Sequence, residues 1–338
     1  MDEVLIQYFD NPDYCVVTPI TSGLINLTYQ INVGVNKYIL QEINSSIFPE
    51  PEIIIANMLF LDHFLKEKNY PKETLSIIPN NKGLYLTYAN GKTWRMTKFI
   101  TSSISYNKVV SKEQAFNAAK AISEFHYYLN DFDVNRIKPS IKGFLDFKTR
   151  VKQFNEALEK GNTMRLIETK EIVEYIKSQS YLIDNYLQIN FPQRIVHADA
   201  KISNFLFDEN NENNVLAIID WDTILPGNIL CDFGDMVRTY ANLKEEDDTS
   251  DGNLFSAHNF EALKEGFLLH LKEQLTDVEL DNINLSAQVV ILIQAIRFIT
   301  DYLLNDTYYT ITYEKQNLNR TINQINLLKE LNQYLCIN

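Results

Sequence analysis

Hydrophobic and polar residues alternate in short runs through the first hundred residues of the chain. Such runs, rich in β-branched and aromatic residues and bounded by turn residues, are typical of strands. We predict strands at residues 14–20, 28–33, 38–43, 75–78, 84–88 and 94–100. Between the third and fourth runs, Pro49 and Pro51 lead into a helical pattern at residues 52–68. The pattern predicts a small antiparallel sheet with one helix.

The pattern becomes helical from residue 111. Ser111, with Gln114 in the capping-box position, is typical of a helix N-cap. Long helical patterns continue to about residue 188 and return at residues 232–240, 259–274 and 286–305. Between them, two short runs at 204–207 and 215–219 flank an Asn-rich turn. These two runs predict a β-hairpin.

Two domains follow from this order of elements. We predict an α+β fold with a β-rich N-lobe at residues 1–100 and a mainly helical C-lobe at residues 101–338, which carries the hairpin. A chain of 338 residues that is 45% hydrophobic and 12% aromatic is long and apolar enough for two lobes with a sizeable core.

The charge of the chain narrows the classes of partner. A formal net charge of −13 disfavours sequence-independent nucleic-acid binding, because a phosphate backbone is held by clustered Lys and Arg. The densest acidic run, at residues 245–248, is most simply a solvated loop.

Several features favour a cytoplasmic protein that does not bind membranes. The first residues, MDEVLIQYF, carry two acids and no basic segment, so no secretory signal is expected. The longest apolar run, at residues 289–300, is interrupted by Gln294 and Arg297 and is shorter than the roughly 18 to 20 residues of a membrane span. The three cysteines are far apart and fit neither a disulfide framework nor a zinc site. The pattern does not indicate an oligomeric state.

The stretch HADAKISN, residues 197–204, carries the residue types that phosphoryl transfer needs. An Asp can take the proton of the acceptor hydroxyl, a cation can neutralise the γ-phosphate, and Asn and Asp oxygens can hold Mg²⁺. His197, Asp199 and Asn204 reproduce the H-x-D-x-x-x-x-N spacing of a kinase catalytic loop, in which the Asp is the base and the Asn a metal ligand. Lys201 lies within reach of the transferred phosphate.

A second metal ligand is expected where the hairpin ends. The apolar run 215–219 is followed directly by Asp220. The string at residues 232–234 matches the Asp-Phe-Gly metal motif of protein kinases, but it lies beyond a Pro-Gly turn at the start of a helical pattern. We therefore interpret Asp220 as the main metal ligand, Asp222 as a secondary candidate, and Asp232 as an N-cap or a brace for the catalytic loop.

Other polar residues are open to a structural interpretation. His126, in the helical pattern after Ser111, is expected to pack or cap rather than to catalyse. Asp235 and Arg238 are one helical turn apart, so they could pair with each other or reach toward the site.

Taken together, these stretches resemble the aminoglycoside phosphotransferase and choline kinase superfamily, and most of all its N-acetylhexosamine 1-kinase group. The catalytic loop defines the superfamily, whereas D-W-D-T-x-x-P-G, D-F-G-D-M-V-R-T and R-F-I-T-D-Y-L point to the hexosamine kinase group. The similarity covers nearly the whole chain. It is carried by residues 23–29, 40–44, 98–100, 197–204, 219–227, 232–239 and 296–303.

The resemblance implies a two-lobed, protein-kinase-like fold with ATP between the lobes. It implies Asp199 as the base, with Asn204 and Asp220 holding Mg²⁺. It also implies that the turn at residues 21–27 covers the phosphates and that the segment from Lys98 is the adenine hinge. The candidate nucleotide-binding residues are Ser22, Gly23, Asn26, Gln41, Lys98, Phe99 and Ile100.

The sequence departs from the family pattern at two places. Gln41 stands where many kinases carry a Lys that pairs with phosphate, and Lys37 lies four residues earlier, so the residue that contacts the phosphates stays open. The C-terminal H-N-L-x-R pattern of the hexosamine kinase group begins here with Gln316, so a role for that His is not expected.

A polar stripe in the last apolar helical pattern indicates the acceptor site. Gln294, Arg297, Asp301, Asn305 and Tyr308 share one face if the helix continues that far. One interpretation is an internal Arg297–Asp301 pair with solvent beyond it. The other, which the resemblance favours, is an acceptor pocket lined by Arg297, Asp301 and Tyr308, in which the Arg and the Tyr hydrogen-bond to sugar oxygens.

We therefore expect an ATP- and Mg²⁺-dependent small-molecule kinase that phosphorylates the anomeric hydroxyl of an N-acetylhexosamine such as GlcNAc or GalNAc. A fixed guanidinium in the pocket would repel a polyamine. The anomeric hydroxyl is more acidic than the other sugar hydroxyls, so a weak base such as Asp199 suffices. The alternatives are an aminoglycoside, choline or other small-molecule kinase, and a nucleotide-binding pseudokinase.

Overall fold

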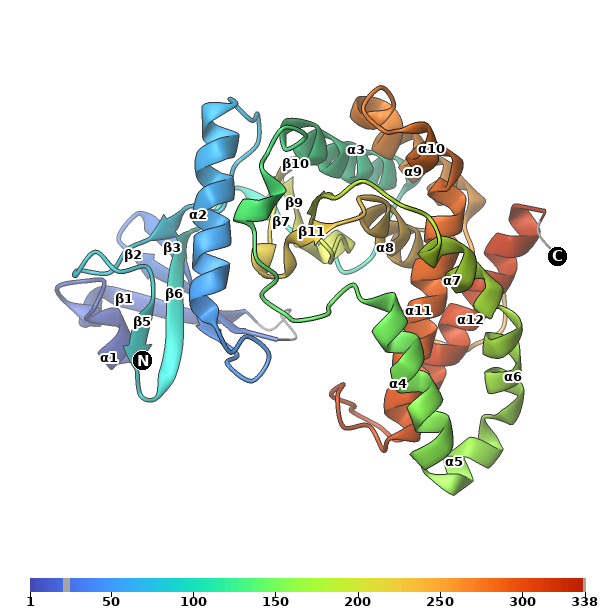
Figure 1. Ribbon diagram of the computed structural model, residues 1–338. Helices are drawn as coiled ribbons and strands as arrows, with labels where there is room; N and C mark the ends of the chain where they lie inside the picture. The colour runs from blue at the N-terminus through green and yellow to red at the C-terminus, as the bar shows by residue number, and fades with distance from the viewer. Residues whose placement is uncertain (21–24, 337–338) are drawn as a thin grey trace. The chain divides into compact units, whose positions relative to one another are not determined.

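The computed structural model of the chain describes residues 1–20 and 25–336 (Figure 1). It divides into two compact units: unit 1 contains residues 1–105, 128–142 and 204–226, and unit 2 contains residues 106–127, 143–203 and 227–338. The expected α+β class is confirmed, because an antiparallel sheet forms in the N-terminal part and helices make up most of the rest. The division into lobes at residue 100 stays a prediction.

The main sheet of unit 1 is formed by the strands that the alternating runs predict. They are β1 (Cys15–Ile20), β2 (Leu27–Val33), β3 (Asn36–Ile43), β4 (Ile77–Ile78), β5 (Thr87–Ala89) and β6 (Lys92–Lys98). Their order is β1-β2-β3-β6-β4, with β5 paired to β6, and all these pairings are antiparallel. Asn90 and Gly91, both with positive φ, form the tight turn between β5 and β6.

The two faces of the main sheet are covered differently. Side chains alternate along β6, so Trp94 and Met96 point to one face, where they pack with Val4 and Leu5 of α1 (Asp2–Leu5). Arg95 points to the other face, toward α2 (Pro51–Glu67), which lies beside the sheet in Figure 1. The buried residues of α2 recur at helical spacing and form its packed face.

A second, small sheet of unit 1 contains the predicted hairpin. Its order is β10-β9-β7, from β7 (Ser103–Ile104), β9 (Phe205–Asp208) and β10 (Asn211–Ile218). The Asn-rich stretch predicted as a long turn is mostly strand, because β10 already begins at Asn211 and a register shift follows between Asn211 and Val215. The bulge accommodates the extra residues while the ladder continues. The short helical turn η4 (Trp221–Thr223) comes next.

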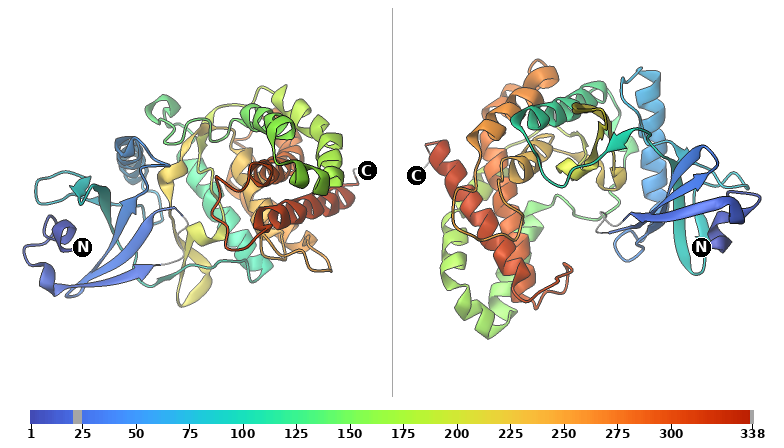
Figure 2. Two further views of the ribbon diagram at one scale, coloured as in Figure 1. Left: turned by 90° about the horizontal axis from the view of Figure 1, so that it is seen from below. Right: turned by 180° about the vertical axis from the view of Figure 1, so that it is seen from behind.

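Unit 2 is helical, and its long helix α11 (Ile283–Leu303) packs against α4, α7, α8 and α12. Figures 1 and 2 show α11 and α12 side by side. The helices and short elements here are α3 (Lys112–Tyr128), α4 (Phe147–Lys160), α5 (Thr163–Glu168), α6 (Lys170–Ser178), α7 (Ser180–Leu187), β8 (Arg194–Val196), α8 (Leu230–Tyr240), α9 (Ala257–Leu271), α10 (Asp277–Asp281) and α12 (Gln316–Tyr334). The short elements η3 (Ile202–Asn204) and β11 (Leu225–Gly227) span the two sequence boundaries between the units. Two short 3₁₀ turns, η1 (Pro12–Tyr14) and η2 (Val134–Arg136), belong to unit 1.

Local signals account for several of the helices in unit 2. Ser111 caps α3 as predicted: its Oγ accepts the backbone N–H of Gln114 at 3.1 Å. α8 approaches α11 closely because Gly234 has no side chain, and a Cβ there would lie 2.6 Å from Val290. α11 is long and apolar enough to cross a membrane by length and composition, but 67% of the relevant window is buried inside the protein. Its apolar character is accounted for by its central place in the core.

Helix α12 was not predicted, and its buried face mixes apolar residues such as Leu318, Ile325 and Leu328 with polar ones. Gln288 of α11 donates to Asn332 at 2.7 Å, and Asn242 donates to Asn323 at 2.8 Å. Hydrogen bonds between side-chain amides thus replace part of the apolar packing, and the polar positions weaken the hydrophobic period in the sequence. The buried polar residues of α12 are Gln316, Asn317, Thr321, Asn323, Gln324 and Asn332.

Candidate active site

The backbone of the predicted catalytic loop, in unit 2, is held by a buried carboxylate. Asp232 of α8 is fully buried and accepts the backbone N–H groups of His197 at 2.8 Å and Ala198 at 2.7 Å. Its other neighbour is His126 of α3, whose Nε2 lies 3.0 Å from the carboxylate. Burial alone would raise the pKa of Asp232, but the two histidines and the hydrogen bonds hold it below its ordinary value. Asp232 therefore braces the loop, and because α8 already begins at Leu230, it is not an N-cap.

The predicted base and its neighbouring cation lie at the exposed part of this loop. Lys201 Nζ is 2.8 Å from Asp199 Oδ2, and both side chains are partly exposed. Between them, the carbonyl of Ala200 accepts the hydroxyl of the buried Tyr240 at 3.0 Å. Asp232 and Tyr240 thus fix the backbone on both sides of Asp199 and leave its carboxylate accessible. The roles of Asp199 and Lys201 in the reaction stay predictions.

Asp235 and Arg238 pair with each other, as one of the two sequence interpretations expects. Arg238 donates to Asp235 Oδ1 at 3.0 and 2.8 Å, and its third bond goes to Glu246 at 2.7 Å. Burial raises the pKa of Asp235, which Arg238 partly offsets, and the negative charge of Asp199 raises it further. The pair is therefore linked electrostatically to the predicted base, which is part of what the other interpretation expects.

The two predicted metal ligands lie at the same end of the hairpin, in unit 1. The carbonyl of Asn204 accepts the backbone N–H of Ile219 at 2.8 Å, and Asp220 follows directly. Asn204 is buried and Asp220 is half-buried. Among the described residues, no group of three or more His, Cys, Asp or Glu forms a metal cluster. One amide oxygen and one carboxylate nevertheless fit Mg²⁺, which usually takes one or two carboxylates together with phosphate oxygens and water.

Asp222, the secondary metal candidate, is committed to another contact. Both its carboxylate oxygens pair with Arg95 of β6, at 2.5 and 2.9 Å, and Asn26 donates to the same carboxylate at 2.8 Å. Its side chain is only 1% exposed. The interpretation of Asp222 as a metal ligand is therefore replaced by a structural one: it is the buried counter-ion of an arginine.

The nucleotide-binding candidates are placed in unit 1 as far as they are described. Gln41 lies on β3, where its Oε1 accepts both Nε and Nη2 of Arg95 at 3.0 and 2.8 Å. Lys37 is exposed, and its ammonium lies 5.5 Å from the ring centre of Phe99. Lys98 ends β6, and Phe99 and Ile100 follow it; the Ile100 carbonyl accepts Ser103 Oγ at 2.6 Å. Ser22 and Gly23 lie outside the described residues.

The predicted polar stripe of α11 does not continue to Tyr308. The helix ends at Leu303, and Asn305 and Asp306 adopt positive φ, so Asn305 and Tyr308 belong to the following loop. Asp301 is buried and accepts the backbone N–H groups of Tyr308 at 2.7 Å and Tyr309 at 3.0 Å, as well as Asn317 Nδ2 at 2.9 Å. Its carboxylate anchors the loop, which explains why the chain turns away from the helix axis.

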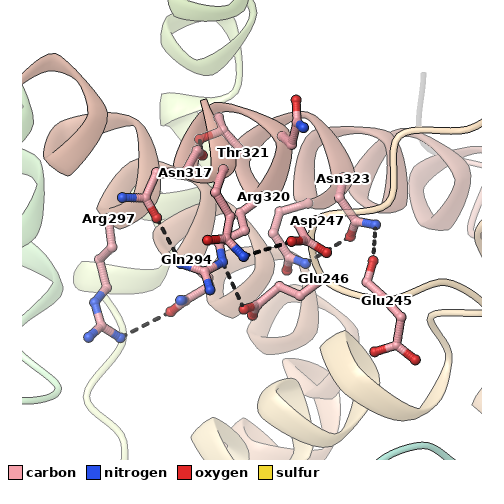
Figure 3. Close-up of polar contacts among 12 residues, drawn as sticks. Glu245, Glu246, Asp247, Gln294, Arg297, Asn317, Arg320, Thr321 and Asn323 are labelled. Carbon is pink, nitrogen blue, oxygen red and sulfur yellow. Dashed lines mark hydrogen bonds and ion pairs between the residues drawn. The ribbon is translucent and has the colours of Figure 1, made fainter. Parts of the chain in front are cut away.

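Arg297 is paired with neutral groups rather than with Asp301. Its Nη1 donates to Gln294 Oε1 at 3.0 Å (Figure 3). Its guanidinium lies 5.8 and 5.7 Å from the ring centres of Phe144 and Tyr309. A second arginine, Arg150 of α4, is close enough that burial and the charge of Arg297 lower its pKa. Arg150 was not anticipated, because nothing in the sequence links α4 to α11.

The acidic run at residues 245–248 lies in a partly exposed loop, but it is not simply solvated, because it also has partners within the protein. Glu246 pairs with Arg238 at 2.7 Å and lies 3.6 Å from Arg320 of α12. Asp247 accepts Gln316 Nε2 at 2.8 Å, and Asn323 donates to the Glu245 carbonyl at 2.9 Å. Figure 3 shows these side chains meeting along α12. The expectation fails because the partners come from helices that lie far away in the sequence.

Several solved structures are similar to this chain. A microcompartment-associated aminopropanol kinase is similar, with a TM-score of 0.69 at 12% identity over 98% of this chain and 96% of that one. A spectinomycin phosphotransferase in complex with ADP and spectinomycin has a TM-score of 0.62 at 12% identity, over 94% of this chain and 93% of that one. An ethanolamine kinase of Plasmodium vivax has a TM-score of 0.57 at 17% identity, over 92% of this chain and 82% of that one. These likenesses show the fold.

The sequence model described as "Phosphotransferase enzyme family" matches residues 16–261. The chain therefore belongs to this family and is a phosphotransferase.

Proposed function

We propose that the protein is an ATP- and Mg²⁺-dependent kinase that transfers the γ-phosphoryl group to the anomeric hydroxyl of an N-acetylhexosamine. In this proposal Asp199 accepts the hydroxyl proton, and the Lys201 ammonium neutralises charge on the transferred phosphate. Asn204 and Asp220 hold Mg²⁺, which, when bound, offsets the negative charge of the phosphates.

The arrangement around Asp199 supports its role as a base. Its loop is fixed by Asp232 and Tyr240, so the carboxylate needs little reorganisation before proton transfer. Lys201 places an ammonium 2.8 Å from this carboxylate. An anomeric hydroxyl is acidic enough that a carboxylate of ordinary basicity can take its proton as the bond to phosphorus forms.

The choice of acceptor rests on one observation: Arg297 has no carboxylate partner among the described residues. Its contacts are an amide and two aromatic rings, and a second arginine, Arg150, lies near enough to feel its charge. A polyamine or amino alcohol would add a third positive charge to this region, which costs free energy. A neutral sugar can instead accept hydrogen bonds from the guanidinium and pack its apolar face on a ring.

Aminopropanol and ethanolamine, named for two of the similar structures, are the natural alternative acceptors. They carry an amine, so recognition would call for an uncompensated carboxylate near the acceptor. Glu246 and Asp301, two acids that contact α12 or the loop before it, are each already paired or hydrogen-bonded. The amino-alcohol function is therefore the second candidate.

The test is acceptor-dependent ADP release with MgATP over a panel of GlcNAc, GalNAc, glucose, galactose, mannose, choline, aminopropanol and kanamycin. The Asp199→Asn variant, which keeps the size of the side chain, is the matched control for the base. The proposal expects release with an N-acetylhexosamine that is lost in the variant. Release with an amine acceptor alone would retain the kinase and refute the sugar. Nucleotide binding without release on any acceptor would favour a pseudokinase.

A further inference from the structure

The main sheet of unit 1 carries a buried cation, Arg95, on β6 rather than on β3. At the position where related kinases place a lysine, β3 has Gln41, and its partner in the β3–β6 register is Arg95. Arg95 is 2% exposed, and its Nη1 lies 3.4 Å from the sulfur of Met58 in α2. An arginine is seldom buried so completely unless its donors are all satisfied.

The contacts of Arg95 exclude a direct role on phosphate. Nε and Nη2 both donate to Gln41, and Nη1 and Nη2 donate to the two oxygens of Asp222. This is a bidentate arginine–carboxylate pair in which Gln41 provides a third acceptor, and lysine cannot reproduce this geometry. The guanidinium is therefore committed to Gln41 and Asp222.

At the other end of the pair, Asp222 belongs to the short segment that begins with Asp220. Asp220 adopts a left-handed conformation, with φ 63° and ψ 57°. For a residue other than glycine this conformation is uncommon, although Asp adopts it more readily than most, so we expect neighbouring contacts to hold it in place. Here the neighbours are known: Arg95 and Asn26 hold the Asp222 carboxylate, and the hydroxyl of Ser140 donates to the Asp222 carbonyl.

Further contacts continue this restraint on both sides of Asp220. The indole of Trp221, which is 2% exposed, donates to the Ile218 carbonyl at 2.9 Å. Asn26, in the described part of the predicted phosphate turn, also accepts the backbone N–H of Asn44 at 3.0 Å. The buried pair thus ties the end of the hairpin to β3, to β6 and to Asn26.

We propose that Arg95 is a positioning residue for the metal site. Its pair with Asp222 holds the segment in the conformation that presents the Asp220 carboxylate to Mg²⁺, and thereby takes the place of the lysine-based ion pair that β3 lacks. The inference rests on the proposed function, because it concerns the Mg²⁺ of that function. Partners that orient a metal ligand typically change metal affinity by about 10- to 100-fold when they are altered.

The experiment measures binding of a non-hydrolysable ATP analogue by calorimetry across a series of Mg²⁺ concentrations, so that no turnover is needed. The test variant is Arg95→Gln with Asp222→Asn, which replaces the ion pair by amides and leaves no unpaired buried charge. The matched control is Arg194→Gln with Glu279→Gln, a buried pair of similar geometry at 2.7 and 2.9 Å in unit 2. Urea unfolding reports the stability of both variants.

We expect the test variant to need about 10-fold or more Mg²⁺ for half-maximal strengthening of nucleotide binding, while binding without Mg²⁺ is unchanged. The control should bind as the wild type does. Equal Mg²⁺ dependence in the test variant and the control would overturn the proposal and leave the proposed function intact. Failure of the wild type to bind nucleotide would overturn both.

A second variant covers the case in which the double variant does not fold. Arg95→Lys keeps a buried cation opposite Asp222 but cannot bridge its two oxygens and Gln41 together. We expect a several-fold higher Mg²⁺ requirement for this variant, and an unchanged requirement in the folded protein would refute the proposal. The same calorimetric series measures it.

Discussion

Replacing Asp232 by Asn tests whether the catalytic loop depends on its buried brace. The carboxylate accepts two backbone N–H groups, at 2.8 and 2.7 Å, through different oxygens. Asparagine has only one acceptor oxygen, so its NH₂ group must face one of these donors. The variant therefore loses at least one charge-assisted hydrogen bond, worth about 1.5 to 3 kcal/mol, and leaves a buried donor unsatisfied. His126 also loses its anionic partner.

Because of the lost hydrogen bond, the unsatisfied donor and the lost partner of His126, we expect Asp232→Asn to lower the free energy of unfolding by on the order of 3 kcal/mol. The loop should shift as well, and a displacement of about 1 Å at the reacting groups can cost on the order of 100-fold in rate. The prediction is therefore a loss in kcat that exceeds any change in KM for MgATP, measured by ADP release at a temperature where the variant is folded.

Glu279→Gln is the control for this variant. Glu279 is another fully buried, paired carboxylate, bound to Arg194 at 2.7 Å, and its loss should lower stability without the kcat effect. Urea unfolding measures the free energy of both proteins. An Asp232→Asn protein that loses less than about 1 kcal/mol and keeps its kcat would refute the brace, because surface-like changes have effects of that size.

Three further predictions address the acceptor side and pH. Arg297→Gln should raise the KM for the sugar about 10-fold or more with the KM for MgATP unchanged, since one charged hydrogen bond is lost; steady-state kinetics measures both, and an unchanged sugar KM would contradict it. Asp301→Asn should lower stability by about 1 to 3 kcal/mol and expose residues 304–309 to limited proteolysis, because the loop loses its anchor. The folded-state pKa of Asp232 lies below its unfolded value near 3.8, so its stabilisation is complete above that pH and is lost as the pH falls through the folded pKa. Acid unfolding of the wild type should show this loss, and Asp232→Asn should lack that part of it.

The parts of the fold that were predicted from sequence are those with a local periodic signal. The alternating runs located the main sheet, and the capping residues Ser111 and Gln114 located the start of α3. The loop 197–204 and Asp220 were found because their spacing is chemically restrictive. Asn204 and Asp220 do lie at one end of a hairpin, where that spacing expects them.

The parts that were missed depend on contacts between residues far apart in sequence. In the sequence, Arg95 is an ordinary polar residue of a predicted strand. Only the strand register brings it opposite Gln41, and only the fold brings it next to Asp222. The buried face of α12 includes six polar residues among its apolar ones, which weakens the hydrophobic pattern. Asp301 fits the helical stripe in sequence, yet the loop that folds back onto it ends the helix. None of these contacts has a local signature.

The most direct test of the central claim is phosphorus NMR of the product formed from MgATP and GlcNAc or GalNAc. The account predicts a sugar phosphate whose phosphorus couples to the anomeric proton, formed by the wild type and not by Asp199→Asn. A phosphate ester at another hydroxyl, or product formation that survives Asp199→Asn, would contradict it.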